Sequence, residues 1–136
     1  MKLLMIALVF FMIACTSADN STERLPFEVT LYVRCDTGVI FYETEVQAKE
    51  GDSVFDVLLR EMREAEIHMS FRTTPIINTA YVEAINNRFE FDAGPLSGWK
   101  YRVNGEFPGI SPSSYTLQPG DAIEWLFSLD MGRDLE

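Results

Sequence analysis

The chain has 136 residues and a formal net charge of −10, from 21 acidic and 11 basic side chains. A surface this acidic argues against binding to nucleic acid and against direct adsorption to anionic lipids, because both carry negative charge. The length suits one domain behind a short leader, which is enough chain to bury a hydrophobic core without disulfides.

The first fourteen residues predict a signal peptide. Lys2 supplies a positive charge, and residues 3–14 form an apolar run that has the length of a signal-peptide core and is too short to span a bilayer. The run ends at Ala14-Cys15, a small residue before a cysteine, which resembles the cleavage box of a bacterial lipoprotein. We therefore expect lipidation of Cys15 and an extracytoplasmic protein that is lipid-anchored to the cell membrane. The alternative is ordinary secretion after cleavage nearby.

Residues 15–26 are polar and lack an apolar period, which predicts a lipidated cysteine followed by a flexible tether. Cys35 is the other cysteine of the sequence, so lipidation of Cys15 leaves it without an intramolecular disulfide partner. Cys35 ends an alternating strand on its apolar face. We interpret it as a small buried hydrophobic residue rather than a reactive thiol.

Two strands joined by a turn are the first elements predicted in the domain. Residues 27–35 alternate apolar and polar side chains, which is typical of a half-buried strand. A turn containing Gly38 leads into a return strand over residues 39–48. In this return strand we expect one phase to be shared by Ile40, Tyr42 and Val46.

A helix is predicted next, because Ser53 and the acidic Asp56 three residues later form a capping box. We expect the helix to end near Glu66 and to lie across one face of a sheet. Its apolar stripe recurs at helical spacing and consists of Val54, Val57, Leu58, Met62 and Ala65.

Residues 67–78 show no clear period and are interpreted as a connection. Residues 79–86 have strand character, and an asparagine turn leads from them into residues 89–91.

A hairpin is predicted in the C-terminal half. Residues 98–103 alternate large apolar and cationic side chains, and Asn104-Gly105 is the pair that a two-residue type I′ turn requires. The register that this turn sets places Phe107 opposite Arg102, so Phe107 points away from the apolar face. Pro108 then lies opposite Tyr101. The apolar face itself consists of Trp99, Tyr101 and Val103.

The last predicted strand covers residues 122–129 and follows a type II turn at Pro119-Gly120. Its apolar face is predicted to hold Ile123, Trp125, Phe127 and Leu129. The order hairpin, helix and then several strands predicts an α+β fold over residues 27–136, with a β-grasp-like mixed sheet packed on one helix.

Four pieces of the sequence carry a resemblance to a known family. They are Gly51-Asp52-Ser53-Val54-Phe55-Asp56-Val57-Leu58, Gly98-Trp99-Lys100-Tyr101-Arg102-Val103-Asn104-Gly105-Glu106, Tyr115 with Leu117, and Pro119-Gly120-Asp121-Ala122-Ile123-Glu124-Trp125. Together they resemble the transcobalamin C-terminal-like domain, also called domain-of-unknown-function family 4430, over roughly residues 27–134. Residues 130–135 resemble the acidic tail that is frequent in bacterial members, which are often surface lipoproteins.

The resemblance implies a β-grasp domain that, in the animal vitamin B12 carriers, closes over one face of cobalamin. It implies a non-catalytic protein that binds cobalamin or another corrinoid through the hairpin and loops of residues 98–112. The carriers also use a large helical domain, for which this chain has no room, so either the affinity is low or a second surface protein completes the site. By position, the candidate ligand-binding residues are Trp99, Tyr101, Phe107, Pro108 and Ile110.

Competing interpretations remain for these residues. The alternation of the strand favours a place in the core for Trp99 and Tyr101. The domain as a whole is alternatively a surface protein–protein interaction module that docks through a sheet edge or Phe107, or a glycan binder, with no small-molecule ligand.

An enzyme is not expected. His68 is the single histidine of the chain and stands in an irregular segment, so neither a histidine-based metal site nor a Ser-His-Asp triad finds support. Asp130, Asp134 and Glu136 lack the glycine placement of a calcium loop, and we interpret them as a solvated acidic tail. We therefore expect no resident cofactor and no metal.

Overall fold

A computed structural model describes residues 25–77 and 79–136. The predicted signal peptide, Cys15 and most of the predicted tether lie outside these residues, so the leader and its lipidation stay predictions.

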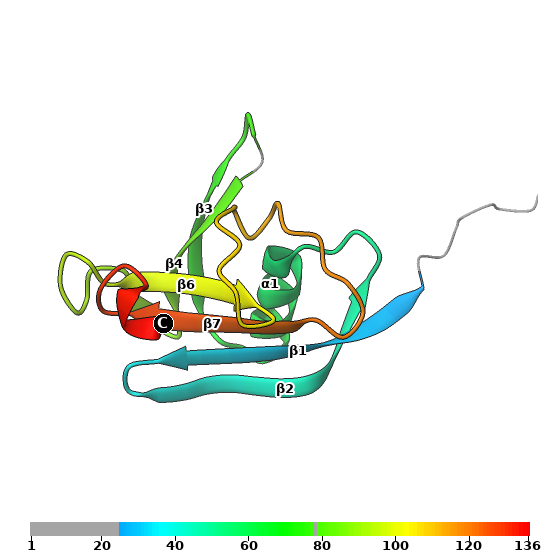
Figure 1. Ribbon diagram of the computed structural model, residues 1–136, viewed down its shortest axis with the longest axis horizontal. Helices are drawn as coiled ribbons and strands as arrows, with labels where there is room; N and C mark the ends of the chain where they lie inside the picture. The colour runs from blue at the N-terminus through cyan, green and yellow to red at the C-terminus, as the bar shows by residue number, and fades with distance from the viewer. Residues whose placement is uncertain (1–24, 78) are drawn as a thin grey trace, which may run out of the picture.

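The larger sheet has four strands, which are β1 (Pro26–Cys35), β2 (Gly38–Lys49), β6 (Gly98–Val103) and β7 (Ala122–Ser128). Their order across the sheet is β2-β1-β7-β6, so β6 is an edge strand (Figure 1). The β1–β7 pair is parallel and the other pairs are antiparallel, which confirms the predicted mixed sheet.

A smaller sheet has the order β3-β4-β5 and is formed by β3 (Met69–Thr74), β4 (Thr79–Ile85) and β5 (Arg88–Phe89). The β3–β4 hairpin projects from the rest of the molecule (Figure 1). The remaining elements are α1 (Val54–Glu64) and a short 3₁₀ turn, η1 (Arg133–Leu135).

The capping box predicted for α1 is confirmed. The Ser53 hydroxyl accepts a hydrogen bond from the Asp56 N–H at 3.1 Å, and the Asp56 carboxylate accepts one from the Ser53 N–H at 2.8 Å. The helix ends at Glu64, and Ala65 is an exposed C-cap rather than part of the buried stripe. The side chains that α1 buries are Val54, Phe55, Val57, Leu58 and Met62.

The core lies where α1 meets the larger sheet and β4. Its members come from the helix and from both sheets, and they include Leu31, Leu58, Val82, Trp99 and Ile123. The helix and the strands share one continuous apolar core. This arrangement confirms the α+β fold class that the sequence predicts.

The prediction of a plain connection over residues 67–78 was wrong, because β3 lies within it. Phe71 packs against Phe55 of α1, with ring centroids 5.0 Å apart. β3 is an edge strand whose later residues are all polar and exposed, so only Met69 and Phe71 carry an apolar alternation. Two residues are too few to produce a period in the sequence.

The predicted phase of β2 was also wrong. The register with β1 shifts between Val29 and Leu31, and such a bulge exchanges the two faces of a strand. Val46 is buried, whereas Tyr42 lies on the outer face against Tyr32, with ring centroids 5.7 Å apart.

The hairpin at Asn104-Gly105 forms only its first rung. Both turn residues have positive φ, as predicted, and Val103 pairs with Glu106. Beyond that pair the chain leaves β6, so the predicted pairs of Phe107 with Arg102 and of Pro108 with Tyr101 do not form. β6 pairs with β7 along its whole length instead, because β7 offers a longer apolar partner than a segment that contains proline.

The predicted faces of β6 and β7 are largely confirmed. Trp99, Tyr101 and Val103 are all buried on one face of β6, and Ile123, Trp125 and Phe127 are buried on the same face of β7. Leu126 is also buried but lies on the opposite face. Leu129 was assigned to the face of Trp125, but it lies beyond the end of β7 and is exposed.

We expect the substitution Arg88→Ala to lower the free energy of unfolding by about 2 kcal/mol. The Arg88 guanidinium donates to both carboxylate oxygens of Asp36, at 3.0 and 2.6 Å, and lies 4.7 Å from the ring centroid of Phe127. It thereby joins the β1–β2 turn to the smaller sheet. Urea unfolding followed by circular dichroism measures the loss. Arg133→Ala removes an exposed ion pair and is the control, with a much smaller expected loss. Equal losses for the two variants would contradict this role of Arg88.

Candidate ligand-binding groove

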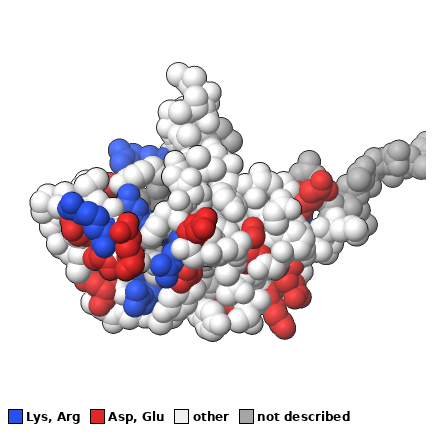
Figure 2. All heavy atoms as spheres, viewed as in Figure 1, with Lys and Arg blue, Asp and Glu red and all other residues white. Residues whose placement is uncertain are grey.

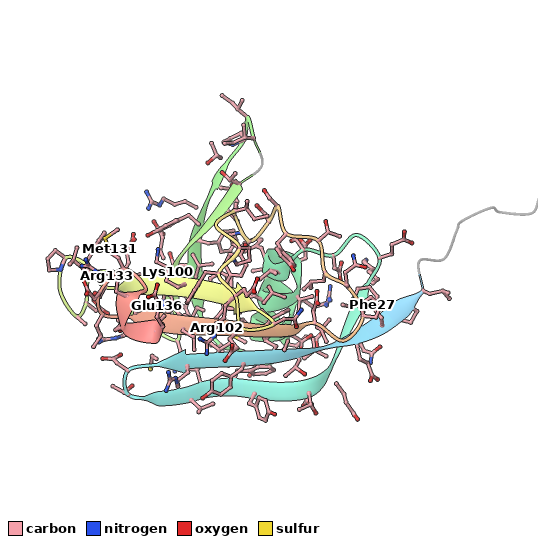
Figure 3. All side chains as sticks on the ribbon, viewed as in Figure 1. Phe27, Lys100, Arg102, Met131, Arg133 and Glu136 are labelled. Atoms are coloured by element: carbon pink, nitrogen blue, oxygen red, sulfur yellow. The ribbon has the colours of Figure 1, made fainter. Side chains whose placement is uncertain are left out.

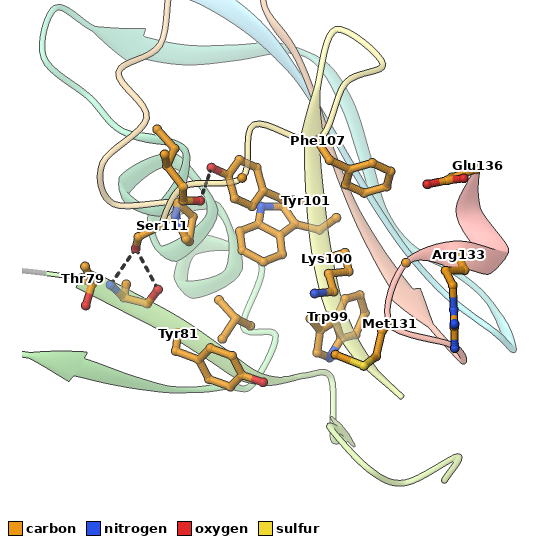
Figure 4. Close-up of a pocket in the computed structure, with 17 residues that line it drawn as sticks. Thr79, Tyr81, Trp99, Lys100, Tyr101, Phe107, Ser111, Met131, Arg133 and Glu136 are labelled. Atoms are coloured by element: carbon orange, nitrogen blue, oxygen red, sulfur yellow. Dashed lines mark hydrogen bonds between the residues drawn. The ribbon is translucent and has the colours of Figure 1, made fainter. Parts of the chain in front are cut away.

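A groove of about 640 Å³ runs along the edge of β6. Its walls are β4, the loop of residues 107–112 and the C-terminal turn, which consists of residues 129–136 (Figure 4). The side chains that decide its chemistry are Tyr81, Trp99, Lys100, Tyr101, Phe107, Ile110, Trp125 and Met131.

The floor of the groove is aromatic. Trp99, Tyr101 and Trp125 contribute their rings, and each is also part of the core. The Trp99 indole donates to the Arg88 carbonyl at 2.8 Å, and the Tyr101 and Trp125 ring centroids lie 5.3 Å apart. These contacts fix the floor in place because each ring is held by both packing and a neighbouring element. The Trp125 indole N–H is buried and has no hydrogen-bond partner within the described part of the chain.

The loop of residues 107–112 is held against the floor and against β4. The Tyr101 hydroxyl donates to the Ile110 carbonyl at 2.7 Å. The Ser111 hydroxyl lies 3.0 Å from both the N–H and the carbonyl oxygen of Ala80, accepting from the first and donating to the second (Figure 4). The loop is held through the Ile110 carbonyl and the Ser111 hydroxyl, and not through the side chains of Phe107 and Ile110. These two side chains therefore remain 39% and 49% exposed.

The structure brings four of the five predicted ligand-binding residues to this groove. Trp99 and Tyr101 line its floor, and Phe107 and Ile110 line its rim. Pro108 is not among the lining residues. Trp99 and Tyr101 also belong to the core, so the two interpretations of these residues are compatible. That they contact a ligand stays a prediction.

Charged side chains stand at one end of the groove. Lys100, Arg133 and Glu136 lie together beside β6 and the C-terminal turn (Figure 3). Figure 2 shows Lys and Arg side chains gathered at this end of the molecule, with acidic side chains among them. Arg133 pairs with Asp130 at 2.6 Å, whereas Lys100 is in no ion pair within residues 25–77 and 79–136. Lys100 is therefore the cation of the groove that is available to a ligand.

Hydrogen bonds hold the C-terminal turn to the end of β7, while Asp134 and Glu136 stay exposed, as the sequence predicts. Asp134 accepts hydrogen bonds from the Ser128 hydroxyl at 2.5 Å and from the Leu129 N–H at 2.9 Å. Burial alone would raise the pKa of Asp134, but these hydrogen bonds outweigh it and hold the pKa below its usual value. The turn depends on Gly132, whose φ of 92° is unfavourable for residues with a side chain. Met131 and Arg133 thereby become part of the groove.

Sequence reasoning missed the contributions of β4 and of the C-terminal turn. Tyr81 lies on β4, far along the chain from the hairpin, and its hydroxyl donates to Glu90. Met131 and Gly132 both have positive φ. The glycine shortly after the last strand is the one sequence feature that could have indicated a turn there. No local pattern shows that β4 faces β6.

The side chains of Tyr81 and Tyr101 are expected to lose their protons at a higher pH than a free tyrosine does. Burial raises the pKa of Tyr101 to about 12, and burial followed by the hydrogen bond to Glu90 raises that of Tyr81 to about 12. A raised pKa means that the folded protein holds the phenol proton more tightly than the unfolded chain does. The resulting stability is complete below a pH of about 10 and is lost as the pH rises towards about 12.

Ultraviolet absorbance of ionised tyrosine, recorded as the pH rises, checks this expectation. The phenols of Tyr81 and Tyr101 should ionise in a late phase at a pH of about 12. The double variant Tyr81→Phe with Tyr101→Phe should remove the late phase, and its thermal midpoint should fall less between a pH of about 9 and about 11. Absence of the late phase from the titration of the wild-type protein would contradict the placement of these two side chains.

Metal-ligand clusters and membrane-spanning helices are not found among the described residues. Within residues 25–77 and 79–136, no three His, Cys, Asp or Glu side chains are grouped so that they can hold a metal ion. In the same residues, no helix combines the length and the apolar character needed to cross a bilayer. Cys35 is half-buried against the core and its Sγ lies 3.0 Å from the Thr37 hydroxyl.

Comparisons with known proteins agree with this architecture. A family model described as "Domain of unknown function (DUF4430)" matches residues 51–128. The crystal structure of haptocorrin in complex with Cbi is similar with a TM-score of 0.64 and 19% sequence identity, over 85% of this chain and 28% of that chain. A crystal structure from Ruminococcus gnavus ATCC 29149, of a protein for which metal binding has been suggested, is similar with a TM-score of 0.52 and 12% identity, over 75% of this chain and 96% of that one.

These likenesses establish the fold. This chain corresponds to 28% of the length of the haptocorrin chain. No curated protein matches the sequence. The family match covers the helix, β4, β6, the loop of residues 107–112 and β7, and therefore most of the groove.

Proposed function

The chain belongs to the DUF4430 family of domains, and we propose that it is a non-catalytic extracytoplasmic lipoprotein that binds a ligand in the groove along β6. We propose cobalamin or another corrinoid as that ligand. The observation that carries the proposal is the groove itself, with its fixed aromatic floor, its exposed apolar rim and Lys100, which is in no ion pair among the described residues.

The chemistry of the groove supports a ligand with a broad apolar body and polar groups at its periphery. The floor offers ring faces, and the rim offers Phe107, Ile110 and Met131. Small-molecule sites are typically concave, mostly apolar and supplied with a few polar groups. A corrinoid has this character because amide side chains surround its flat macrocycle. Cobalamin also carries a phosphodiester, for which Lys100 is the matching cation.

The size of the groove supports partial enclosure of the ligand. A volume of about 640 Å³ holds part of a corrinoid, while tight sites bury most of the ligand surface. We therefore propose either weak binding by this chain alone or completion of the site by a second surface protein. The similar haptocorrin chain is longer than this one, which leaves room there for further enclosing residues. Exposed apolar side chains around the opening, such as Tyr81 and Met131, support a covering partner.

The membrane anchor is a separate part of the proposal. Lipidation of Cys15 would place the groove outside the cytoplasmic membrane on a short polar tether. Mass spectrometry of the protein from its native membrane tests this directly. The expected mass lacks residues 1–14 and includes acyl chains on Cys15; an unmodified cysteine, or cleavage at another position, would overturn the anchor and leave ordinary secretion.

Titration of the full chain with cobalamin and with cobinamide, followed by absorbance and calorimetry, tests ligand binding. We expect saturable binding, and we expect Phe107→Ala to weaken it by about tenfold. Phe89→Ala is the matched control, because Phe89 is exposed at 41% against 39% for Phe107 but does not line the groove. Absence of saturation at millimolar ligand, with the chain alone and with co-expressed surface proteins, would remove the corrinoid from the proposal.

A further inference from the structure

We propose that the free edge of β6 binds an extended peptide with alternating apolar and acidic side chains, which adds to the larger sheet as a further strand. This interaction goes beyond the proposed corrinoid site and uses main-chain groups that a corrinoid does not require. It rests on the pairing of β6, on the opposite wall of the groove and on the charge of Lys100.

The backbone of β6 has unpaired hydrogen-bonding groups at two positions. The Asn104 N–H donates to the Ala122 carbonyl at 2.8 Å, so even-numbered residues of β6 face β7. Val103 exchanges both of its bonds with Glu106, on the side away from β7. Trp99 and Tyr101 have the same parity as Val103, and their N–H and C=O groups therefore point into the groove. Within the described residues, these groups have no hydrogen-bond partner.

On the opposite wall, the edge of β4 is already bonded to a side chain at one position. Ser111 both accepts from the Ala80 N–H and donates to the Ala80 carbonyl. These are the two bonds that one residue of a neighbouring strand exchanges with an antiparallel partner. Ser111 thereby satisfies the edge of β4 at Ala80, while the edge of β6 across the groove keeps its donors and acceptors free at Trp99 and Tyr101. An added strand on β4 would have to displace Ser111, so we expect it on β6.

The side chains on either side of the edge select the peptide. Successive residues of an added strand point to opposite faces of the sheet. On the face of Trp99 and Tyr101 they meet the apolar rim at Phe107 and Ile110. On the other face they meet Lys100, which is in no ion pair within the described residues. A peptide that places carboxylates towards Lys100 is complementary to it, whereas a cationic peptide is repelled.

A labelled peptide of about seven residues, alternating valine and glutamate, is the probe, and fluorescence polarisation with the full chain is the readout. We expect saturable binding that weakens by at least about tenfold when lysine replaces glutamate in the peptide. Alternate N-methylation of the peptide should weaken binding by about tenfold or more, because it removes the donors that pair with β6.

Two substitutions assign the charge preference to the groove. Lys100→Glu should reverse the preference between the glutamate and lysine peptides, with Lys100→Met as a neutral variant that should abolish the preference. Lys49→Glu is the matched control, because Lys49 is likewise in no ion pair of the described residues but lies on β2, outside the groove. Lys49→Glu should leave both affinities within about twofold.

Hydrogen exchange locates the bound peptide. The amides of Trp99 and Tyr101 should exchange more slowly in the complex, while that of Arg102, which already faces β7, should change little. Binding that tolerates N-methylation, protection elsewhere alone, or no saturation at millimolar peptide would each overturn the inference. The corrinoid titration is a separate experiment. If the peptide does not bind, the proposed function is unaffected, and if the corrinoid does not bind, the proposed peptide site is unaffected. If both bind, we expect them to compete.

Discussion

The substitution Trp99→Ala is expected to lower the free energy of unfolding by about 3–5 kcal/mol, the range typical of large aromatic residues removed from a core. Trp99 is 7% exposed, and its ring meets that of Phe127 edge-on with centroids 5.4 Å apart. Its indole N–H donates to the Arg88 carbonyl at 2.8 Å. The change therefore leaves a cavity beneath the groove and an acceptor without its donor. Urea unfolding followed by far-ultraviolet circular dichroism measures the loss.

Two further variants separate the contributions of Trp99. Trp99→Phe keeps most of the ring packing but loses the hydrogen bond, so its cost should be smaller, at about 1–2 kcal/mol. Lys100→Ala, at the next position and on the opposite face, should cost less than about 0.5 kcal/mol. A loss below about 1 kcal/mol for Trp99→Ala would show that this residue is not part of the core.

The substitution Asp121→Ala is expected to cost about 3 kcal/mol, because a buried acceptor of two hydrogen bonds is removed. The Asp121 carboxylate accepts from the Gln118 N–H at 2.8 Å and from the Asn104 amide at 2.9 Å. Asn104 in turn accepts from the Ala122 N–H at 2.9 Å. These bonds join the turn after β6 to the turn before β7, so loss of Asp121 leaves both turns with unpaired donors.

A double-mutant cycle tests this coupling. Asn104→Ala alone and Asp121→Ala alone should each be costly, and the double variant should cost clearly less than their sum, by about 1 kcal/mol or more. Asp121→Asn keeps one acceptor oxygen and should fall between the wild type and Asp121→Ala. Additive losses would mean that the two turns are stabilised independently.

The same network explains why two short motifs are more informative together than apart. Asn104-Gly105 and Pro119-Gly120-Asp121 are separate turn signals in the sequence, and each is common alone. In the structure their side chains bond to each other. The helix start was equally predictable, because Ser53 and Asp56 satisfy each other within a single turn. Local chemistry of this kind can be read from adjacent residues.

Pairing between distant segments could not be read in this way. The turn at Asn104-Gly105 suggested that β6 pairs with the residues that follow it, but β6 pairs with β7. The competition was decided by the longer apolar surface of β7, which a turn signal does not report. β3 was missed for a related reason, since it is an edge strand that needs only Met69 and Phe71 on the core side. Bulges such as the one opposite Val29 change faces without a sequence signal.

The groove was predictable in part. Trp99, Tyr101, Phe107 and Ile110 lie in one continuous segment, and a resemblance that covers this segment brings them together. Tyr81 and Met131 come from a strand and a turn far from it in the sequence. Their place at the groove depends on how the smaller sheet and the C-terminal turn pack, which is tertiary information.

Nuclear magnetic resonance of the isotope-labelled full chain, titrated with cobinamide, tests the groove as a ligand site most directly. We expect saturable shifts of the backbone amides of Trp99, Tyr101, Phe107 and Ile110. Leu59 and Arg63, which line a separate hollow beside α1, should not shift. Saturable shifts confined to the α1 hollow, or no saturable shifts at millimolar cobinamide, would contradict this expectation.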